Sequence, residues 1–467
     1  MERIKRLNIR IISLLGFVML IFISIGCSIE NNPIDPIIEQ IVNPDMEALE
    51  GEVLTIAISR NKGFLLEFTQ RYMIQNPGIT IEIICYEWIF QRDGNWSAAR
   101  QEISIQLMAG TGPILIDSEL VDSLNPPSQQ LLFDWFPIMQ ASPDFNEDDW
   151  FMNVFHATAI NGRLYKFPIG FSYEVVSYNS LIPGLSETMS GREGITLSEL
   201  FDIYDNFCYD KTHNFMYLFS PGWMLPYFID NFIDLENGIV DFNDEFIKLI
   251  TYANNITSFT HLDWSDPTIF IPINRDAYLS ERYLLSSSHS AWYNMMLDIN
   301  DVFNFKGYIP IIDISGEVFI NVSGGGKGWL LNANATKEQL AIAWDFMQFM
   351  NNPNNYPGNW MTSAAPANRS MLMHQLKINL YGVDGVIRRF NPDVRLDEIV
   401  GTSDIVFEKI TEISERPLRN LNRLPDSLNI VLLDAISQFT YGLISAEQTA
   451  QNLQNQVELM IMEMGLD

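Results

Sequence analysis

A repeated alternation of strand-length and helix-length patterns constrains the fold of this sequence more than any other feature. Residues 53–58 form a short apolar run, and apolar side chains then recur at helical spacing between Leu65 and Tyr72. A second apolar run follows over residues 79–84. A strand, a helix and a strand within about 30 residues make a βαβ unit, which has a parallel sheet and a right-handed crossover. The pattern therefore predicts an α/β fold.

The alternation continues along the rest of the chain. A helix-like segment over 98–108 leads into a strand-like run over 114–117, and another strand-like run covers 328–331. Capping boxes at Thr336 and Ser445 predict the starts of two later helices. The sequence has no internal repeat and no low-complexity block, and its 47% hydrophobic content supports large cores. Its 467 residues are enough for two or three domains.

The first 26 residues are typical of a secretory signal peptide. A cationic start precedes an apolar run over residues 11–25, and Cys27 follows directly. Since a helix needs roughly 20 apolar residues to cross a bilayer, cleavage is favoured over an uncleaved anchor. The segment before Cys27 resembles the bacterial lipobox, although Ser24 stands where that motif usually has leucine. This resemblance implies lipidation of Cys27, and residues 27–50 are then predicted to form a polar tether.

Charge and cysteine content narrow the possible partners. The formal net charge of −30 argues against a nucleic-acid partner or binding to anionic lipid, which need clustered lysine and arginine. Such acidity favours a soluble monomer at a cell surface. Apart from Cys27, the chain has Cys85 and Cys208, which lie far apart in sequence. A disulfide between them is open, but two buried free thiols are favoured.

The common enzyme motifs are missing from the sequence. The five histidines lie at least 28 residues apart, so no zinc-binding spacing occurs. There is no GxSxG elbow, and the glycine-rich segment 323–328 lacks the spacing of a phosphate-binding loop. We therefore predict no catalytic residue, no metal site and no cofactor. The 58 carboxylates still leave open a pair that cleaves glycosidic bonds.

Several tryptophans lie beside turns and polar residues rather than on helix faces. Trp88 follows Glu87, and Trp292 follows a serine- and histidine-rich segment over 287–290. Sugars stack their apolar faces on aromatic rings, while carboxylates and amides bind their hydroxyl groups. Most tryptophans belong to hydrophobic cores, so this pattern alone only suggests a carbohydrate ligand.

Five segments resemble, in the correct order, the extracellular solute-binding proteins of ABC importers, in the cluster that includes maltose-binding protein. The matching segments are Asn76-Pro-Gly-Ile79, Met108-Ala-Gly-Thr-Gly-Pro113, Asn161-Gly-Arg-Leu-Tyr-Lys-Phe-Pro168 with Tyr178-Asn179, Gly328-Trp-Leu-Leu331 with the helix after it, and Pro366 with Arg369-Ser370. One departure is Ile114, which replaces an aspartate of the family's second motif. The resemblance spans most of residues 53–465.

The resemblance implies the type II fold of periplasmic binding proteins, in which two α/β lobes are joined by several chain crossings. Lobe 1 would comprise residues 50–170 and 324–365, and lobe 2 would comprise residues 171–318 and 370–467. A solute would bind between the lobes, which close by bending at the crossings. Glycines are suited to crossings because a hinge must absorb changes in φ and ψ. The hinge residues implied are Gly170, Phe171, Ser172, Gly324 and Pro366.

The resemblance also implies positions for ligand binding. Asn61 and Lys62 match a loop that presents an Asp-Lys pair to sugar, and Glu87 lies where that branch has an acid. Trp223 and Trp292 match aromatic positions of the same branch. The segment from Asp117 to Asp122 lacks that branch's tryptophan and Asp-Arg pair, so the ligand need not be maltose. The full set of expected ligand contacts is Asn61, Lys62, Glu87, Trp88, Asp117, Tyr173, Trp223, Trp292 and Gly325.

The resulting hypothesis is an exported protein, anchored by lipid on the extracytoplasmic face of the cell membrane. It would capture a mono- or oligosaccharide and deliver it to ABC permease subunits. Two alternatives stay open at this point. One is a secreted glycan-active enzyme, and the other is a ligand-sensing partner of a membrane signalling protein.

Overall fold

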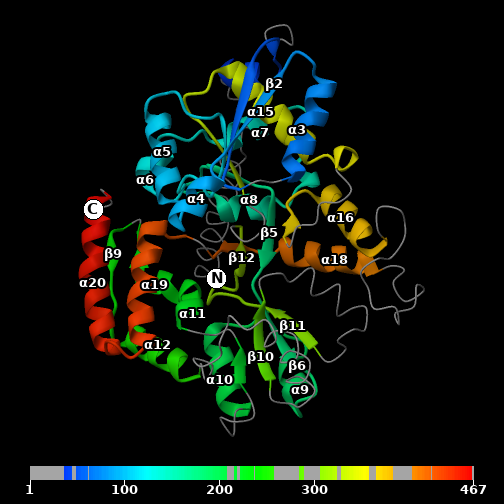
Figure 1. The fold of residues 1–467 in the computed structure, drawn as a ribbon. Coiled ribbons are helices and arrows are strands. Elements are labelled where there is room, and N and C mark those ends of the chain that lie inside the picture. Colours follow the sequence, from blue (N-terminus) through cyan, green and yellow to red (C-terminus); the bar gives the residue numbers. More distant parts are fainter. Residues whose placement is uncertain are drawn as a thin grey trace, which may run out of the picture.

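The computed structural model consists of two lobes joined by a small sheet (Figure 1). Lobe 1 contains strands β1 to β4 and β13, and lobe 2 contains strands β6, β7, β10 and β11 together with the C-terminal helices. The predicted architecture of two α/β lobes is confirmed. The structure describes residues 36–44, 49–60, 63–207, 215–217, 221–235, 237–256, 283–288, 306–322, 328–356, 364–381, 402–421 and 423–464.

The sheet of lobe 1 has the strand order β2-β1-β3-β13-β4. The first three strands are parallel, as the βαβ pattern predicts, and β13 is antiparallel to both of its neighbours. The apolar runs form these strands because both faces of the sheet are covered by helices. The strands are β1 (Val53–Ile58), β2 (Thr80–Cys85), β3 (Leu115–Asp117), β4 (Lys166–Pro168) and β13 (Gly328–Leu331).

Lobe 1 has a separate core on each face of its sheet. On one face, Leu54, Ile56 and Ile58 of β1 pack with α3, α7 and α15. On the other face, Ala57 packs with α4 and α5. The capping box predicted at Thr336 is present at the start of α15. The helices of this lobe are α2 (Pro36–Val42), α3 (Gly63–Gln75), α4 (Glu87–Asp93), α5 (Ser97–Met108), α6 (Pro126–Gln129), α7 (Trp135–Ala141), α8 (Met152–Thr158) and α15 (Lys337–Met350).

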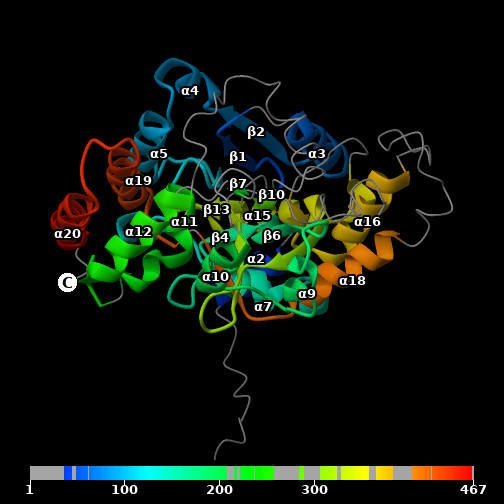
Figure 2. The same ribbon diagram turned by 90° about the horizontal axis from the view of Figure 1, so that it is seen from below.

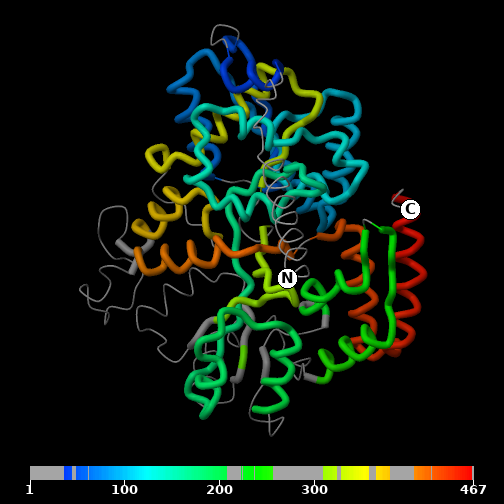
Figure 3. Tube along the Cα trace, turned by 180° about the vertical axis from the view of Figure 1, so that it is seen from behind, coloured from blue at the N-terminus to red at the C-terminus, as the bar shows by residue number. Residues whose placement is uncertain are grey.

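The sheet of lobe 2 has the order β11-β6-β10-β7 and is mostly antiparallel. Its core also holds Leu428 and Leu432 of α19 and Leu453 and Val457 of α20. Seen from behind, α19 and α20 lie beside α11 and α12 (Figure 3). The elements are β6 (Val175–Asn179), β7 (Phe215–Tyr217), β10 (Tyr283–Ser288), β11 (Lys306–Pro310), α9 (Leu185–Met189), α10 (Leu197–Phe207), α11 (Pro221–Phe228), α12 (Asp244–Ile256), α19 (Asp426–Thr440) and α20 (Ala446–Glu463), with the two-stranded ribbon β8 (Ile233–Asp234) and β9 (Ile239–Val240).

A third sheet joins the lobes. Its order is β14-β5-β12-β15, so the three predicted crossings lie side by side. Gly170 pairs with Pro366, Phe171 with Ala365, and Ser172 with Asn321. Gly170 suits this close pairing because an added Cβ would lie 3.0 Å from the Ala365 carbonyl oxygen. The strands are β5 (Gly170–Tyr173), β12 (Val318–Asn321), β14 (Ala365–Pro366) and β15 (Leu418–Asn420).

Two predicted boundaries need correction. Residues 370–467 do not all belong to lobe 2, because α16 (Arg369–Tyr381) and α18 (Thr402–Ser414) pack against the joining sheet through Leu372, Val406 and Ile410. Seen from below, these two helices lie on the side opposite α19 and α20 (Figure 2).

The tether predicted over 27–50 also differs from the structure. Pro36–Val42 forms helix α2, which contacts α7 and α15, and Ile38 and Ile41 are buried in the core of lobe 1. Any free tether therefore ends before Pro36. The signal peptide and Cys27 lie outside the described residues. Among the helices that are described, none combines the length and apolar character of a membrane span.

Candidate functional site

Asp117 lies at the carboxyl end of β3, next to the loop that follows β1. Its Oδ2 atom accepts hydrogen bonds from the Ser59 hydroxyl at 2.6 Å and from the Ser59 amide at 3.2 Å. Its Oδ1 atom accepts from the Glu119 amide at 3.3 Å. Asp117 and Ser59 are both completely buried. In this arrangement its carboxylate links two loops and has no access to solvent, and its contact with a ligand stays a prediction.

Glu87 and Trp88 begin helix α4, directly after β2. The Trp88 side chain is 54% exposed, and the Arg92 guanidinium lies 5.2 Å from its ring centroid. The Arg60 guanidinium lies over the rings of Phe90 and Trp96 on the adjacent surface. The exposed Trp88 ring is accessible for stacking, and its ligand role stays a prediction.

Tyr173, which the resemblance implies as a ligand contact, is buried in this arrangement. It is 1% exposed, and its hydroxyl donates to the Ile410 carbonyl at 2.8 Å and contacts the Ser414 hydroxyl. Burial raises the pKa of Tyr173 far above its usual range, so the hydroxyl stays protonated. Trp223 belongs to helix α11, but its side chain is outside the described part. Asn61, Lys62, Trp292, Gly324 and Gly325 lie wholly outside the described residues.

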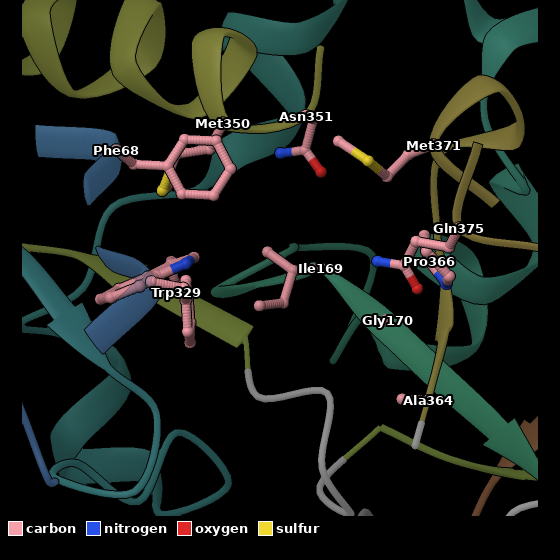
Figure 4. A pocket seen from close by; sticks show the side chains of 11 residues that line it. Phe68, Ile169, Gly170, Trp329, Met350, Asn351, Ala364, Pro366, Met371 and Gln375 are labelled. Atoms are coloured by element: carbon pink, nitrogen blue, oxygen red, sulfur yellow. The ribbon is translucent and has the colours of Figure 1, made fainter. Parts of the chain in front are cut away.

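A small cavity lies where lobe 1 meets the joining sheet (Figure 4). Phe68 and Trp329 form one side, Met371 and Gln375 form the other, and Ile169 projects between them (Figure 4). The predicted hinge residues Gly170 and Pro366 also line it. Its volume of about 30 Å³ leaves space for one or two water molecules. The cavity is too small to hold a sugar in this arrangement.

A pocket of about 330 Å³ lies in lobe 2, between α11, α19 and the end of β12. It is within the size range of small-molecule sites, which begins near 300 Å³. Its apolar walls are leucines of α11, of α19 and of the segment before α19, together with Pro226 and Ile229. Its polar walls are Asp230, Asn321, Arg423 and Asn429. Gly222 also lines it, within the segment whose aromatic neighbour Trp223 is predicted to bind the ligand.

The polar side of this pocket carries opposite charges close together. The Arg423 guanidinium lies 3.7 Å from Asp230 Oδ2, which also binds the Arg419 guanidinium at 2.5 Å. The Arg423 side chain is 52% exposed. A carboxylate accepts hydrogen bonds and a guanidinium only donates them, so a hydroxyl group placed between them could bind to both. We call this cavity the lobe 2 pocket.

Sequence reasoning missed the charged residues of the lobe 2 pocket. Asp230 and Arg423 are almost 200 positions apart and belong to no recognisable motif, so only their packing brings them together. The one available signal was the segment that includes Gly222. A second pocket of about 320 Å³ is lined only by residues 136–162 of lobe 1, so it does not involve the other lobe. Within the described ranges, no three His, Cys, Asp or Glu side chains are grouped to hold a metal ion.

Comparisons with known proteins agree with this architecture. No protein-family model and no curated protein sequence matches the chain. Among solved structures, the sugar-binding protein MalE from Xanthomonas citri is 13% identical with a TM-score of 0.58, over 88% of this chain and 98% of that one. The extracellular solute-binding protein family 1 from Alicyclobacillus acidocaldarius is 12% identical with a TM-score of 0.56, over 88% and 99%.

A third similar structure is the cyclic alpha-maltosyl-1,6-maltose binding protein from Arthrobacter globiformis. It is 13% identical with a TM-score of 0.51, over 88% of this chain and 99% of that one. The similarity extends over nearly the whole length of each of these proteins, and at such identities it concerns the fold. This chain therefore has the two-lobe fold of the extracellular and periplasmic solute-binding proteins.

Proposed function

We propose that this chain is an extracytoplasmic solute-binding protein that captures a mono- or oligosaccharide between its lobes and delivers it to an ABC permease. The observation that carries the proposal is the joining sheet, in which β5, β12 and β14 run side by side between two complete α/β lobes. Binding proteins of known structure with this fold include a sugar-binding protein, a cyclic alpha-maltosyl-1,6-maltose binding protein and a chitin oligosaccharide binding protein.

The mechanism follows from the separation of the cores. Each lobe has its own hydrophobic core, so the lobes can move as units while the joining strands bend. A solute that contacts both lobes binds the closed arrangement more tightly than the open one, and this difference in affinity drives closure. Permease recognition would then depend on the closed arrangement.

The lobe 2 pocket supplies the chemistry for a sugar. Asp230 accepts hydrogen bonds from hydroxyl groups, and Arg423 donates to them. The predicted ligand contacts Asn61, Lys62, Glu87, Trp88, Trp223, Trp292 and Gly325 would complete the site.

A thermal-shift screen with sugars, peptides and polyols, followed by calorimetry, tests the ligand class. A ligand at 100 times its Kd stabilises the folded chain by about 2.7 kcal/mol, which raises the melting temperature measurably. A sugar that binds and is recovered intact supports the proposal. Stabilisation only by peptides would refute the sugar, and release of a cleaved glycan would make the protein an enzyme.

An Arg423→Gln variant tests the lobe 2 pocket. Loss of a charged hydrogen bond to the ligand should weaken binding by roughly tenfold or more. The melting temperature without ligand should stay nearly constant, because Arg423 is 52% exposed and Asp230 keeps its ion pair with Arg419. Lys409→Gln is the matched control, since Lys409 is 58% exposed and lies on α18, away from the pocket. Equal affinity of both variants for the sugar would exclude Arg423 from the site.

The anchor can be tested separately in bacterial cells. We propose that Cys27 is lipidated after removal of residues 1–26, and that the chain remains on the outer face of the membrane. Cys27→Ala should then abolish fatty-acid labelling and release the protein from the membrane fraction. Unchanged labelling and fractionation would refute the lipid anchor without affecting the binding proposal.

A further inference from the structure

The N-terminus of helix α19 in lobe 2 is capped by a side chain of lobe 1. The residue before the helix, Pro425, supplies no side-chain cap, and the amide of Asp426 donates instead to Asp122 Oδ2 at 2.8 Å. Asp122 belongs to the turn after β3 and also accepts from the Leu124 amide at 3.1 Å. A carboxylate at a helix N-terminus satisfies a free amide and interacts favourably with the helix dipole.

An ion pair joins the lobes at the same place. The Arg100 guanidinium of α5 binds the Asp426 carboxylate, and its Nε donates to the Glu119 carbonyl at 2.8 Å. The side chains of Arg100 and Asp426 are 30% and 44% exposed. Arg100 is therefore held by lobe 1 while it contacts the first residue of α19.

Lys166 of β4 is a further cation of lobe 1. Its aliphatic stem crosses directly over Gly328, where an added Cβ would overlap it. Burial lowers the pKa of Lys166 to about 8, although attraction to Asp122 and Asp426 raises it. Burial and repulsion by Asp426 raise the pKa of Asp122, while its amide contacts and Arg100 lower it.

We propose that Arg100, Asp122 and Asp426 form a latch that limits how far the lobes open before a solute binds. The latch lies on the side of α19 and α5, opposite the helices α16 and α18 that flank the joining sheet (Figure 2). Opening the lobes would separate Arg100 from Asp426 and leave the first amide of α19 without its cap. The proposal concerns the solute-free chain, so it does not depend on the identity of the solute.

Hydrogen exchange at the start of α19, together with X-ray scattering of the solute-free full chain, tests the latch. Asp122→Ala removes the cap and Arg100→Gln removes the ion pair. Each should raise the exchange rate of the Asp426 amide by about tenfold and increase the radius of gyration. Asp122→Asn should behave like the unmodified protein, because its amide oxygen still accepts the hydrogen bond and the repulsion from Asp426 is gone.

Arg71→Gln is the matched control, since it breaks the Glu67–Arg71 ion pair, which lies within lobe 1. It should change neither measurement. Salt provides a test without mutation, because 1 M NaCl shortens the screening length to about 3 Å and should open the unmodified protein. The proposal is overturned if Asp122→Ala and Arg100→Gln remain as compact and as protected as the Arg71→Gln control, or if high salt leaves the radius of gyration unchanged.

Discussion

Replacement of Arg419 by methionine should destabilise the fold strongly, because this residue fastens the joining sheet to lobe 2. Its guanidinium lies 2.5 Å from Asp230, 2.8 Å from Asp313 and 3.7 Å from Glu317. Arg419 itself stands on β15, whereas Asp313 lies between β11 and β12. The side chain is 23% exposed, and that of Asp313 is only 7% exposed.

The size of the destabilisation follows from the carboxylates that lose their cationic partner. Removal of one partner from a fully buried ion pair costs roughly 3–5 kcal/mol, because the other charge stays buried without compensation. Asp230 and Arg419 are about one quarter exposed, so water recovers part of that cost. We therefore expect a loss of roughly 2–3 kcal/mol in the free energy of unfolding. Adding Asp313→Asn to Arg419→Met should restore part of it.

Urea unfolding followed by circular dichroism measures this loss without any ligand. Lys409→Met is the control, since Lys409 and Glu412 form an exposed pair with 3.9 Å between the charged atoms. The control should change the free energy of unfolding by less than about 0.5 kcal/mol. If Arg419→Met is no less stable than Lys409→Met, the reasoning about the buried carboxylates is refuted.

Two further predictions concern stability. Gly328→Ala should reduce the melting temperature sharply, because the added Cβ would meet the Lys166 stem and lie 2.7 Å from the Phe167 carbonyl oxygen. A melting temperature equal to that of the unmodified protein would contradict this. Burial raises the pKa of Asp313, but hydrogen bonds from Ser315, the Glu317 amide and Arg419 lower it overall. The stability that Asp313 contributes is therefore present above about pH 4 and is lost as the pH falls through its lowered pKa. Urea unfolding measures the free energy of unfolding at pH 7 and at pH 3. The decrease between these two values should be smaller for Asp313→Asn than for the unmodified protein.

The sequence predicted those parts of the fold that local patterns encode. Strand β1 is apolar on both faces because helices cover both sides of its sheet, and such a run is visible without any knowledge of tertiary contacts. The capping box at Ser445 likewise depends only on neighbouring residues. Helix α2 was missed because a helix of seven residues shows less than two turns of periodicity and depends on its packing against α15.

The burial of two predicted ligand contacts has a common physical cause. Asp117 is buried by a partner 58 positions away, and Tyr173 is buried by residues more than 230 positions away. A single sequence does not reveal which polar side chain will find such a partner. The same limit hid Asp230 and Arg423, whose proximity arises from the packing of α11 against the segment before α19.

Helix α19 links the proposed pocket and the proposed latch. Asn429 and Leu433 line the lobe 2 pocket, while Asp426, one turn earlier, makes the contact with lobe 1. A helix transmits a displacement along its axis because its backbone hydrogen bonds keep it rigid. A solute that shifts α19 toward lobe 1 would therefore strengthen the latch by some factor. Because linkage is reciprocal, the latch strengthens binding of that solute by the same factor, and a weakened latch must reduce the affinity. Calorimetry of Arg100→Gln with a sugar that binds would measure this factor, although Arg100 lies outside the pocket.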